Sequence, residues 1–474
     1  MKKMWICFGS CLLAIPIALL VWGFLLPQQY GDTFLGELSV KRQLLEQESD
    51  KPRLVILGGS AAAFGVDSAL LAQQLPQYQP VNFGLYAALG TRIMLDLSLE
   101  SLREGDLVIV MPEQQSQTLS DYLGVQAVWQ AADGDFSVLE ALHWRDVSAM
   151  IGQFPRFAAQ KFRYWLTGKP ELTGVYQRSS FNAFGDVVSE LCAANQMPGG
   201  VDETTPIRFA PELLEEGFRQ QLNEYAAVLA QKGVTVWYHF PPMNESAVEL
   251  DAEVDVYADV LQQRMDLPLA GDPKACILES GWFYDTNFHL NASGKTVFTR
   301  QLIRDIKAML GDSTPTGIAQ PAMPELLSPA TEEKQLDNAD ADCFVWEQTD
   351  GGLQLIGLTE EGSGRTELTV PGQIHGKPVV ALADTVFEQS KVLQCVTIQS
   401  NIKVLPDGLF AGCLALRQIC LTQTDPAQLA VGQELLRQAA ADCRLVVPAD
   451  SYDRYCLNYS WSPYATFLQR GMNE

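Results

Sequence analysis

The chain has 474 residues, which exceeds the size of an ordinary single domain, so two or three domains are expected. Its composition is that of a globular protein, with 47% hydrophobic and 19% charged residues and no dominant low-complexity repeat. A formal net charge of −24 excludes a general nucleic-acid binder, because binding to phosphates requires a cationic surface.

The first segment of the chain is apolar and long enough to cross a bilayer. Residues 4–26 carry no charge and follow Lys2 and Lys3, and a helix of this length spans the hydrocarbon core. The lysines are expected to stay inside and the rest of the chain to go outside. A cleaved signal peptide is the alternative, but the run is long for that role and no small-residue cleavage site precedes Pro27. We therefore predict an uncleaved signal anchor over residues 1–28, with extracytoplasmic domains after it.

After a predicted stalk at residues 29–50, short apolar segments alternate with longer helical ones. The expected strands are residues 53–57, 80–83, 106–111, 234–240 and 275–279. Helices are expected between the first of them, at residues 67–74 and 92–103. This alternation is typical of a parallel sheet covered by helices. Residues 51–312 are therefore predicted to form an α/β domain, a three-layer sandwich around a parallel sheet.

The interval from about residue 113 to 209 interrupts this alternation. It is too long for a plain connection, and it combines aromatic residues with basic ones. We predict a mostly helical insertion, placed to cover the strand ends as a lid. A solvated helical face is the alternative reading of its basic residues.

The C-terminal part of the chain carries a short repeat behind a linker. Residues 313–342 are rich in Pro, Ser, Thr, Ala and acidic residues, which is typical of an interdomain linker. Beyond it, apolar residues recur at a spacing of 23 residues: Phe387 and Phe410, Leu393 and Leu416, Val396 and Ile419, and Ile398 and Leu421. This period falls within the range of leucine-rich solenoids.

Residues 343–468 resemble the bacterial surface (BspA-like) type of leucine-rich repeat, ending in a cap that contains Trp and Tyr. We therefore predict a small leucine-rich repeat domain with a C-terminal cap over residues 343–474. About two full repeats are visible, so the flanking strands and the cap must complete the core.

The stretch LVILGGSAAAFG places Ser60 where the first predicted strand ends and a helix begins. Backbone N–H groups and the positive helix end at such a turn can face a developing oxyanion, which an esterase requires. Serine is also a favoured helix N-cap, so a purely structural role is the alternative. A dinucleotide-binding loop fits poorly, because the glycines lack the G-x-G-x-x-G spacing and the second strand ends in Asn82 rather than an acid.

A serine nucleophile needs a base that is held in the right tautomer. The stretch YDTNFHLNASGK supplies His289 with Asp285 four residues before it, ahead of a helix expected to begin near Ala292. His239, at the end of the fourth predicted strand, is the competing base. No phosphate-loop lysine or metal-ligand cluster accompanies these residues, so the sequence predicts no cofactor and no metal.

These stretches resemble the SGNH or GDSL hydrolase superfamily. Gly58-Gly59-Ser60 is similar to its first block, VNFGLYAALG to its second and DTNFHLNASG to its last. With GGSAAAFGVDSALL, YQRSSFNAFGD and FPPMN, the chain looks like the membrane-anchored branch of the superfamily, which is similar to the cell-wall O-acetylation proteins and the teichoic-acid D-alanylation transfer protein. The resemblance covers about residues 53–310 and implies a flavodoxin-like SGNH fold.

The resemblance also implies a catalytic set and an oxyanion donor: Ser60 as nucleophile, His289 as base and then acid, Asp285 as the orienting acid and Gly84 as a donor. The third strand departs from the family pattern, because it ends in MPEQQ where the family has an Asn. Gln114 or Gln115 would have to replace that donor, and Glu113 would be unhelpful beside an oxyanion. The acid and the base are also four residues apart, whereas the family usually has three.

The expected function is hydrolysis or transfer of an acyl group outside the cytoplasm, by a serine esterase or O-acyltransferase. The resemblance favours a cell-envelope glycan or polyol polymer as substrate, and a transferase would take a membrane acyl-donor protein as partner. The alternative is a surface protein whose SGNH-like domain is inactive and whose repeats mediate adhesion or protein binding. The MPEQQ departure supports this alternative, and the coexistence of Ser60 and His289 opposes it.

Overall fold

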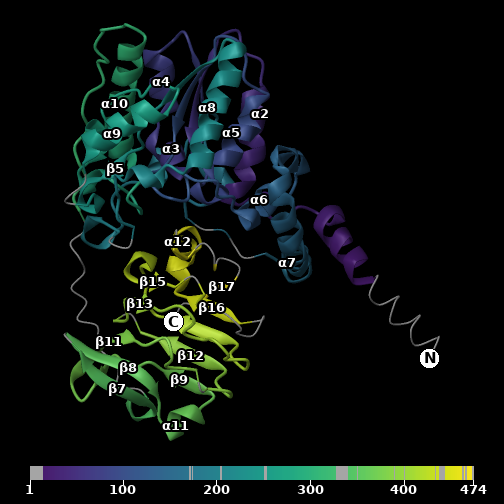
Figure 1. The fold of residues 1–474 in the computed structure, drawn as a ribbon, viewed down its shortest axis with the longest axis vertical. Coiled ribbons are helices and arrows are strands. Elements are labelled where there is room, and N and C mark those ends of the chain that lie inside the picture. Colours follow the sequence, from purple (N-terminus) through teal and green to yellow (C-terminus); the bar gives the residue numbers. More distant parts are fainter. Residues whose placement is uncertain are drawn as a thin grey trace. The chain divides into compact units, whose positions relative to one another are not determined.

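The computed structural model describes residues 14–326 and 340–471, except 170–171, 173, 203–204, 250–252, 350, 389, 400, 433, 437–442, 459, 462–463 and 465–466. The chain is a mixed α/β protein with parallel sheets and divides into two compact units (Figure 1). The first consists of Met1–Gln196 and Ile207–Leu327, and the second of Met197–Pro206 and Ser328–Glu474. Part of the predicted insertion therefore belongs to the second unit.

The first unit is built on a parallel sheet of four strands in the order β2-β1-β3-β4. These strands are β1 (Arg53–Gly58), β2 (Gln79–Asn82), β3 (Leu107–Met111) and β4 (Thr235–Tyr238). Every residue of β1 and β3 is buried, which explains their unbroken apolar sequences. Four predicted strands are thus confirmed. The fifth is only β6 (Ile277–Leu278), which pairs with β5 (Met243–Asn244) in a separate sheet.

Helices lie on both faces of this sheet (Figure 1). On one face are α2 (Leu38–Glu46), α5 (Thr91–Leu99) and α8 (Glu216–Gln231), and on the other α3 (Ser60–Gly65), α4 (Ser68–Gln74) and α10 (Ala292–Met309). Side-chain caps fix two of the helix starts. Asp67 accepts from the N–H of Leu70 at 3.0 Å, and Asn291 accepts from the N–H of Gly294 at 2.9 Å. The positions of α4, α5 and α10 match the prediction.

The stalk prediction for residues 29–50 is corrected by the packing of α2. Leu38, Lys41 and Leu45 lie on one face of this helix and are buried. The ammonium group of Lys41 donates hydrogen bonds to the carbonyl oxygens of Asn82, at 2.9 Å, and Gly185. Burial of this face makes the segment an integral part of the first unit.

The insertion is less helical than predicted. Its longer helices are α6 (Val125–Ala131) and α7 (Val147–Thr167), and most of the rest up to residue 200 is short 3₁₀ turns and loops. Asp186 fastens the last loops to the sheet. Its carboxylate accepts from the Ser68 hydroxyl at 2.7 Å and from the Asn82 side-chain amide at 2.8 Å.

Residues 14–20 form a helix that continues as the π-helical turn η1 (Val21–Leu25). Among the residues that the structure describes, no helix is both long enough and apolar enough to span a membrane. Residues 1–13 of the predicted anchor and residues 327–339 of the predicted linker lie outside the described residues.

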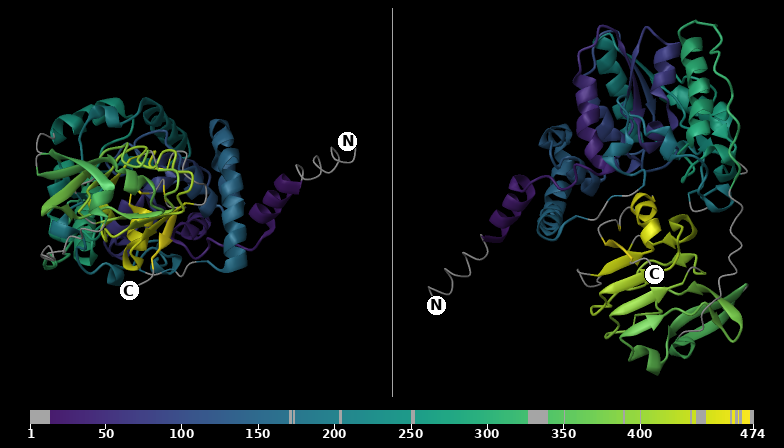
Figure 2. Two further views of the ribbon diagram at one scale, coloured as in Figure 1. Left: turned by 90° about the horizontal axis from the view of Figure 1, so that it is seen from below. Right: turned by 180° about the vertical axis from the view of Figure 1, so that it is seen from behind.

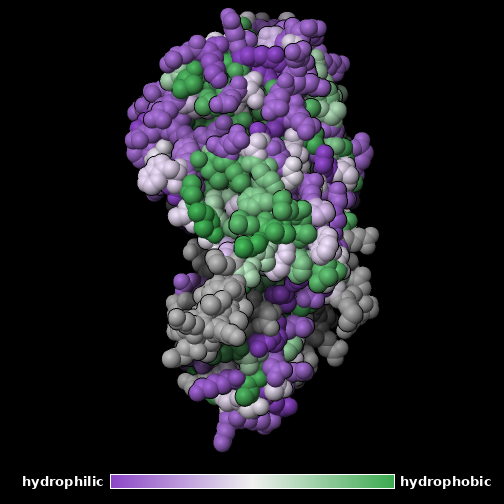
Figure 3. Space-filling model, turned by 90° about the vertical axis from the view of Figure 1, so that its right-hand side faces the viewer, coloured by the Kyte–Doolittle hydropathy of each residue, from purple (hydrophilic) through white to green (hydrophobic). Residues whose placement is uncertain are grey.

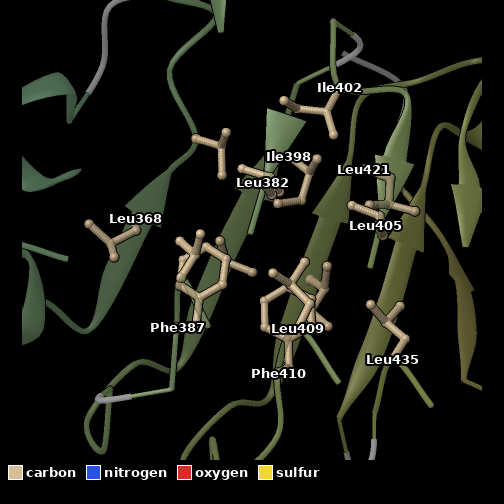
Figure 4. Close-up of a cluster of buried hydrophobic side chains, with 14 of the residues drawn as sticks. Leu368, Leu382, Phe387, Ile398, Ile402, Leu405, Leu409, Phe410, Leu421 and Leu435 are labelled. Carbon is tan, nitrogen blue, oxygen red and sulfur yellow. The ribbon is translucent and has the colours of Figure 1, made fainter. Parts of the chain in front are cut away.

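The second unit contains a parallel sheet of five strands in the order β17-β16-β14-β12-β9 (Figure 2). These are β9 (Glu367–Thr369), β12 (Cys395–Ile398), β14 (Gln418–Leu421), β16 (Arg444–Val447) and β17 (Leu468–Arg470). The 23-residue spacing of the sequence is the register of this sheet, because Val396 pairs with Ile419 and Ile398 with Leu421. The rings of Phe387 and Phe410 stack with centroids 5.1 Å apart in the same core (Figure 4).

Flanking elements complete this core at both ends. At one end, a four-stranded sheet is formed by β7 (Phe344–Thr349), β8 (Gly352–Leu358), β10 (Gln373–Ile374) and β11 (Lys377–Leu382). Near the other end, Trp461 is fully buried, and its indole N–H donates to the carbonyl oxygen of Leu429 at 2.9 Å. This end of the core is therefore closed by a buried aromatic side chain, and its identity as a repeat-domain cap stays a prediction.

Candidate active site

Ser60 is the first residue of α3 and follows β1 after a single residue. The turn depends on the glycines before it. A Cβ atom on Gly58 would lie 2.3 Å from the Met111 carbonyl oxygen, and one on Gly59 would lie 2.4 Å from the Glu113 carboxylate. The side chain of Ser60 is buried, and the residue is 7% exposed. The glycines thus allow the serine to lie against the end of the neighbouring strand β3.

His289 and Asp285 form a hydrogen-bonded pair on one short loop. Nδ1 of His289 lies 2.8 Å from Oδ1 of Asp285. The loop is closed by backbone bonds, because the N–H of Tyr284 donates to the His289 carbonyl oxygen at 2.7 Å and the N–H of His289 donates to the Thr286 hydroxyl at 3.0 Å. The four-residue spacing therefore still brings the acid to the imidazole.

The imidazole of His289 lies against the helix that Ser60 begins. Its ring stacks on Phe64 with centroids 4.1 Å apart and planes 4° apart. Phe64 follows Ser60 by four residues, so the two side chains occupy the same face of α3. Since Nδ1 faces Asp285, Nε2 is the ring nitrogen left for a serine proton. The structure thus brings the predicted nucleophile, base and orienting acid into one region.

Tyr176 is a member of this region that sequence reasoning did not single out. Its hydroxyl donates a hydrogen bond to Oδ2 of Asp285 and lies 3.4 Å from Nδ1 of His289. Burial, reinforced by the negative charge of Asp285, raises the pKa of Tyr176 well above its usual value, so the hydroxyl stays a donor. The signal for this residue was present in the stretch YQRSSFNAFGD, which begins with it.

The predicted oxyanion donors are engaged elsewhere. The N–H of Gly84 donates to Oδ1 of Asn82 at 3.0 Å, within its own loop. The side-chain amide of Gln114 donates to the Arg208 carbonyl oxygen at 3.2 Å. The backbone N–H of Gln115 donates to the Glu113 carbonyl oxygen at 2.8 Å, and its side chain is half-buried. The Gly84 N–H and the Gln114 amide are thus bonded within the protein in this structure, and their roles as oxyanion donors stay predictions.

Glu113 lies beside Ser60, where the oxyanion donors Gly84, Gln114 and Gln115 were expected. Oε1 of its carboxyl group accepts from the N–H of Ala61, the residue after Ser60, at 2.8 Å. Burial raises the pKa of Glu113, while the hydrogen bond from the Ala61 N–H and the nearby His289 act in the opposite direction. The group next to the candidate nucleophile is thus an acid whose environment favours its neutral form.

The competing base, His239, has a different environment. The residue is fully buried. Its Nδ1 lies 2.7 Å from the Phe240 carbonyl oxygen and its Nε2 lies 3.1 Å from Oδ2 of Asp305. Both ring nitrogens are therefore used by the fold, which leaves this histidine no nitrogen for an incoming proton.

Among the residues that the structure describes, no group of three or more His, Cys, Asp or Glu side chains is arranged to hold a metal ion. No family model matches the chain, and no curated protein matches it in sequence.

Proposed function

We propose that the chain is a membrane-anchored, extracytoplasmic serine esterase or O-acyltransferase of the SGNH type. The observation that carries this proposal is the hydrogen-bonded His289–Asp285 pair stacked against α3, whose first residue is Ser60. Nucleophile, base and orienting acid in this relation are what acyl transfer through a serine requires.

In the first half of the reaction, the Ser60 hydroxyl attacks an ester carbonyl carbon while Nε2 of His289 takes its proton. Asp285 stabilises the resulting imidazolium, and the Tyr176 hydroxyl holds Asp285 in position. When the tetrahedral intermediate collapses, the ester C–O bond breaks and His289 returns the proton to the leaving alcohol. In the second half, water or an acceptor hydroxyl attacks the acyl-serine with His289 again as base, which regenerates Ser60.

The developing oxyanion needs donors at the turn between β1 and α3. The backbone N–H of Ser60 and the N–H of Ala61 stand at the start of the helix, where the helix dipole favours negative charge. The Ala61 N–H becomes available once the Glu113 carboxyl group releases it. Protonation of Glu113 also removes the charge that would repel the oxyanion.

The substrate class is taken from the resemblance to envelope-modifying proteins. A cell-envelope glycan or polyol polymer is the acyl acceptor or the ester substrate, and in the transferase case a membrane acyl-donor protein supplies the acyl group. Tethering to the membrane keeps the site close to both. The second unit supplies a parallel, repeat-like sheet that suits a protein ligand.

The test uses the full chain in detergent, with an activated aryl acetate as substrate and a fluorophosphonate as serine label. Wild type is expected to react with both, and Ser60→Ala and His289→Ala are expected to lose both reactions. His143→Ala, in a half-buried histidine paired with Asp96, is the matched control. Labelling without hydrolysis identifies a transferase that lacks its acceptor.

A second candidate is an inactive SGNH-like domain that serves as a binding protein. It is favoured by the engagement of the Gly84 and Ala61 N–H groups within the protein and by the acid at residue 113. A folded wild-type chain that neither hydrolyses the ester nor takes the label would support the inactive binding protein and contradict the proposed enzyme.

A further inference from the structure

A large apolar surface is exposed on the insertion and the N-terminal segment of the first unit. Trp144 is 88% exposed and Ile151 66%, and Leu25 is 75% exposed. The remaining exposed apolar side chains of the two segments are Ile15, Ile17, Leu20, Val21, Phe24, Val147, Trp165 and Leu166. Figure 3 shows the side on which these segments lie, and a hydrophobic patch lies in the middle of that side. Soluble surfaces rarely leave such a patch uncovered.

The exposed apolar residues that belong to α7 form a second apolar stripe along this helix. One stripe of the helix, which includes Met150 and Phe157, faces the body of the unit and is buried. Val147, Ile151 and Leu166 lie outside it and are exposed, at positions where a surface helix normally carries polar residues. The helix is therefore apolar on a side that no described residue of the first unit covers.

The N-terminal segment is fixed to the same helix. The rings of Trp22 and Phe162 stack with centroids 4.2 Å apart. The ammonium group of Lys161 donates to the Gly23 carbonyl oxygen at 3.0 Å. Because of these contacts, residues 15–25 and α7 present one continuous surface, which we call the membrane face. It comprises the exposed apolar residues named above.

The charge of α7 contrasts with that of the whole chain. The chain has a net charge of −24, yet residues 147–169 contain no acidic residue and four basic ones: Arg156, Lys161, Arg163 and Lys169. Lys161 and Lys169 pair with Asp133 and Asp32, while Arg163 is exposed beside Tyr164. A basic helix with exposed Trp and Leu is typical of a segment that lies in the interface of an anionic bilayer.

We propose that α7 and Trp144 lie in the headgroup region of a bilayer containing anionic lipids, with α7 flat on the surface beside residues 15–25, which pass into the lipid as part of the predicted anchor. In the sequence, residues 4–13 directly precede the membrane face and carry no charge, which points to lipid as its occupant. A second copy of the chain fits less well, because it would bring two basic helices together. The inference does not depend on the proposed catalytic activity.

The test is tryptophan quenching in the full chain, reconstituted into vesicles of brominated phosphatidylcholine and phosphatidylglycerol. Trp5 and Trp22 belong to the N-terminal segment, so a double variant Trp144→Phe and Trp165→Phe is expected to lose about half of the quenched emission. Trp346→Phe is the matched control, since Trp346 is 38% exposed in the second unit and lies outside the membrane face. It is expected to leave the quenched emission unchanged.

Equal quenching in the wild type and the double variant would overturn the proposal. A wild-type chain that runs as a dimer in detergent, with Trp165 unquenched in vesicles, would also overturn it and assign the surface to a second copy. Replacing phosphatidylglycerol with further phosphatidylcholine is expected to reduce the quenching of Trp165, and an unchanged value would contradict the role given to the basic residues of α7.

Discussion

The first unit contains two buried histidine–aspartate pairs, and they differ in what the second ring nitrogen does. In the pair at the end of β4, His239 contacts Asp305 through Nε2 and a backbone carbonyl through Nδ1. In the pair beside α3, His289 contacts Asp285 through Nδ1. Among the described residues, Nε2 of His289 has no hydrogen-bond partner. Both histidines were candidate bases in the sequence, but an imidazole can act as a base only where one nitrogen is left for the substrate.

The largest effect is expected from the pair with the uncommitted nitrogen. His289→Ala and Ser60→Ala should each lower turnover of the aryl ester by about 10⁴-fold, because members of a serine triad act as a unit. Thermal unfolding should change little for Ser60→Ala, since the substitution removes only a hydroxyl group from the first residue of α3. Residual turnover within tenfold of wild type in either variant would contradict the assigned roles.

His239→Ala should affect stability rather than chemistry. Removal of the imidazole leaves Asp305 buried beside a cavity, and loss of one partner of such a pair costs about 3 kcal/mol of unfolding free energy. Denaturant unfolding of the full chain measures this loss, while fluorophosphonate labelling below the transition should stay at the wild-type level. Loss of labelling in a folded variant would instead identify His239, and not His289, as the base.

Tyr176→Phe tests how firmly the active pair must be held. The hydroxyl donates to a charged carboxylate, and a hydrogen bond of that kind contributes about 1.5–3 kcal/mol. We expect turnover to fall by about 10-fold to 100-fold and the pH profile of turnover to shift, because His289 loses part of its oriented partner. Tyr78→Phe, in a half-buried tyrosine before β2, is the control and should behave as wild type.

Glu113→Gln is expected to have the smallest effect on rate and the opposite sign. Where Glu113 is ionised, removing its negative charge beside the oxyanion should raise turnover by about tenfold, which corresponds to about 1.4 kcal/mol. The oxygen of Gln can still accept from the Ala61 N–H, so the turn should be preserved. A fall in turnover at pH 8 would instead assign Glu113 a part in the reaction.

The same substitution has a predicted pH dependence of stability. Burial raises the pKa of Glu113 from its usual 4.5, so the folded chain binds this proton more tightly than the unfolded chain. The stabilisation that protonated Glu113 contributes to the folded chain is fully present below pH 4.5, and it is lost as the pH rises through the raised pKa. The stability of Glu113→Gln relative to wild type should therefore be greater at pH 8 than at pH 4, measured by denaturant unfolding at both values.

The sequence by itself determined the features that depend on neighbouring residues. The apolar strands, the Asp67 and Asn291 caps and the loop joining Asp285 to His289 are set within a few positions of the chain. The 23-residue period of the second unit could also be read from the sequence, because residues at equivalent positions of successive repeats pair in neighbouring strands. Periodicity and capping leave marks in sequence because their partners lie at fixed short spacings.

Only the tertiary structure decided which groups surround the candidate nucleophile. Tyr176 reaches Asp285 from 109 residues away, and Glu113 reaches Ala61 from 52 residues away. The packing of α2 and the stacking of His289 on Phe64 are likewise contacts between distant segments. Such contacts depend on how strand ends and insertions meet in space, and no local pattern specifies that geometry. The sequence therefore predicted a candidate catalytic set, while the fold decided which hydrogen bonds the predicted oxyanion donors make.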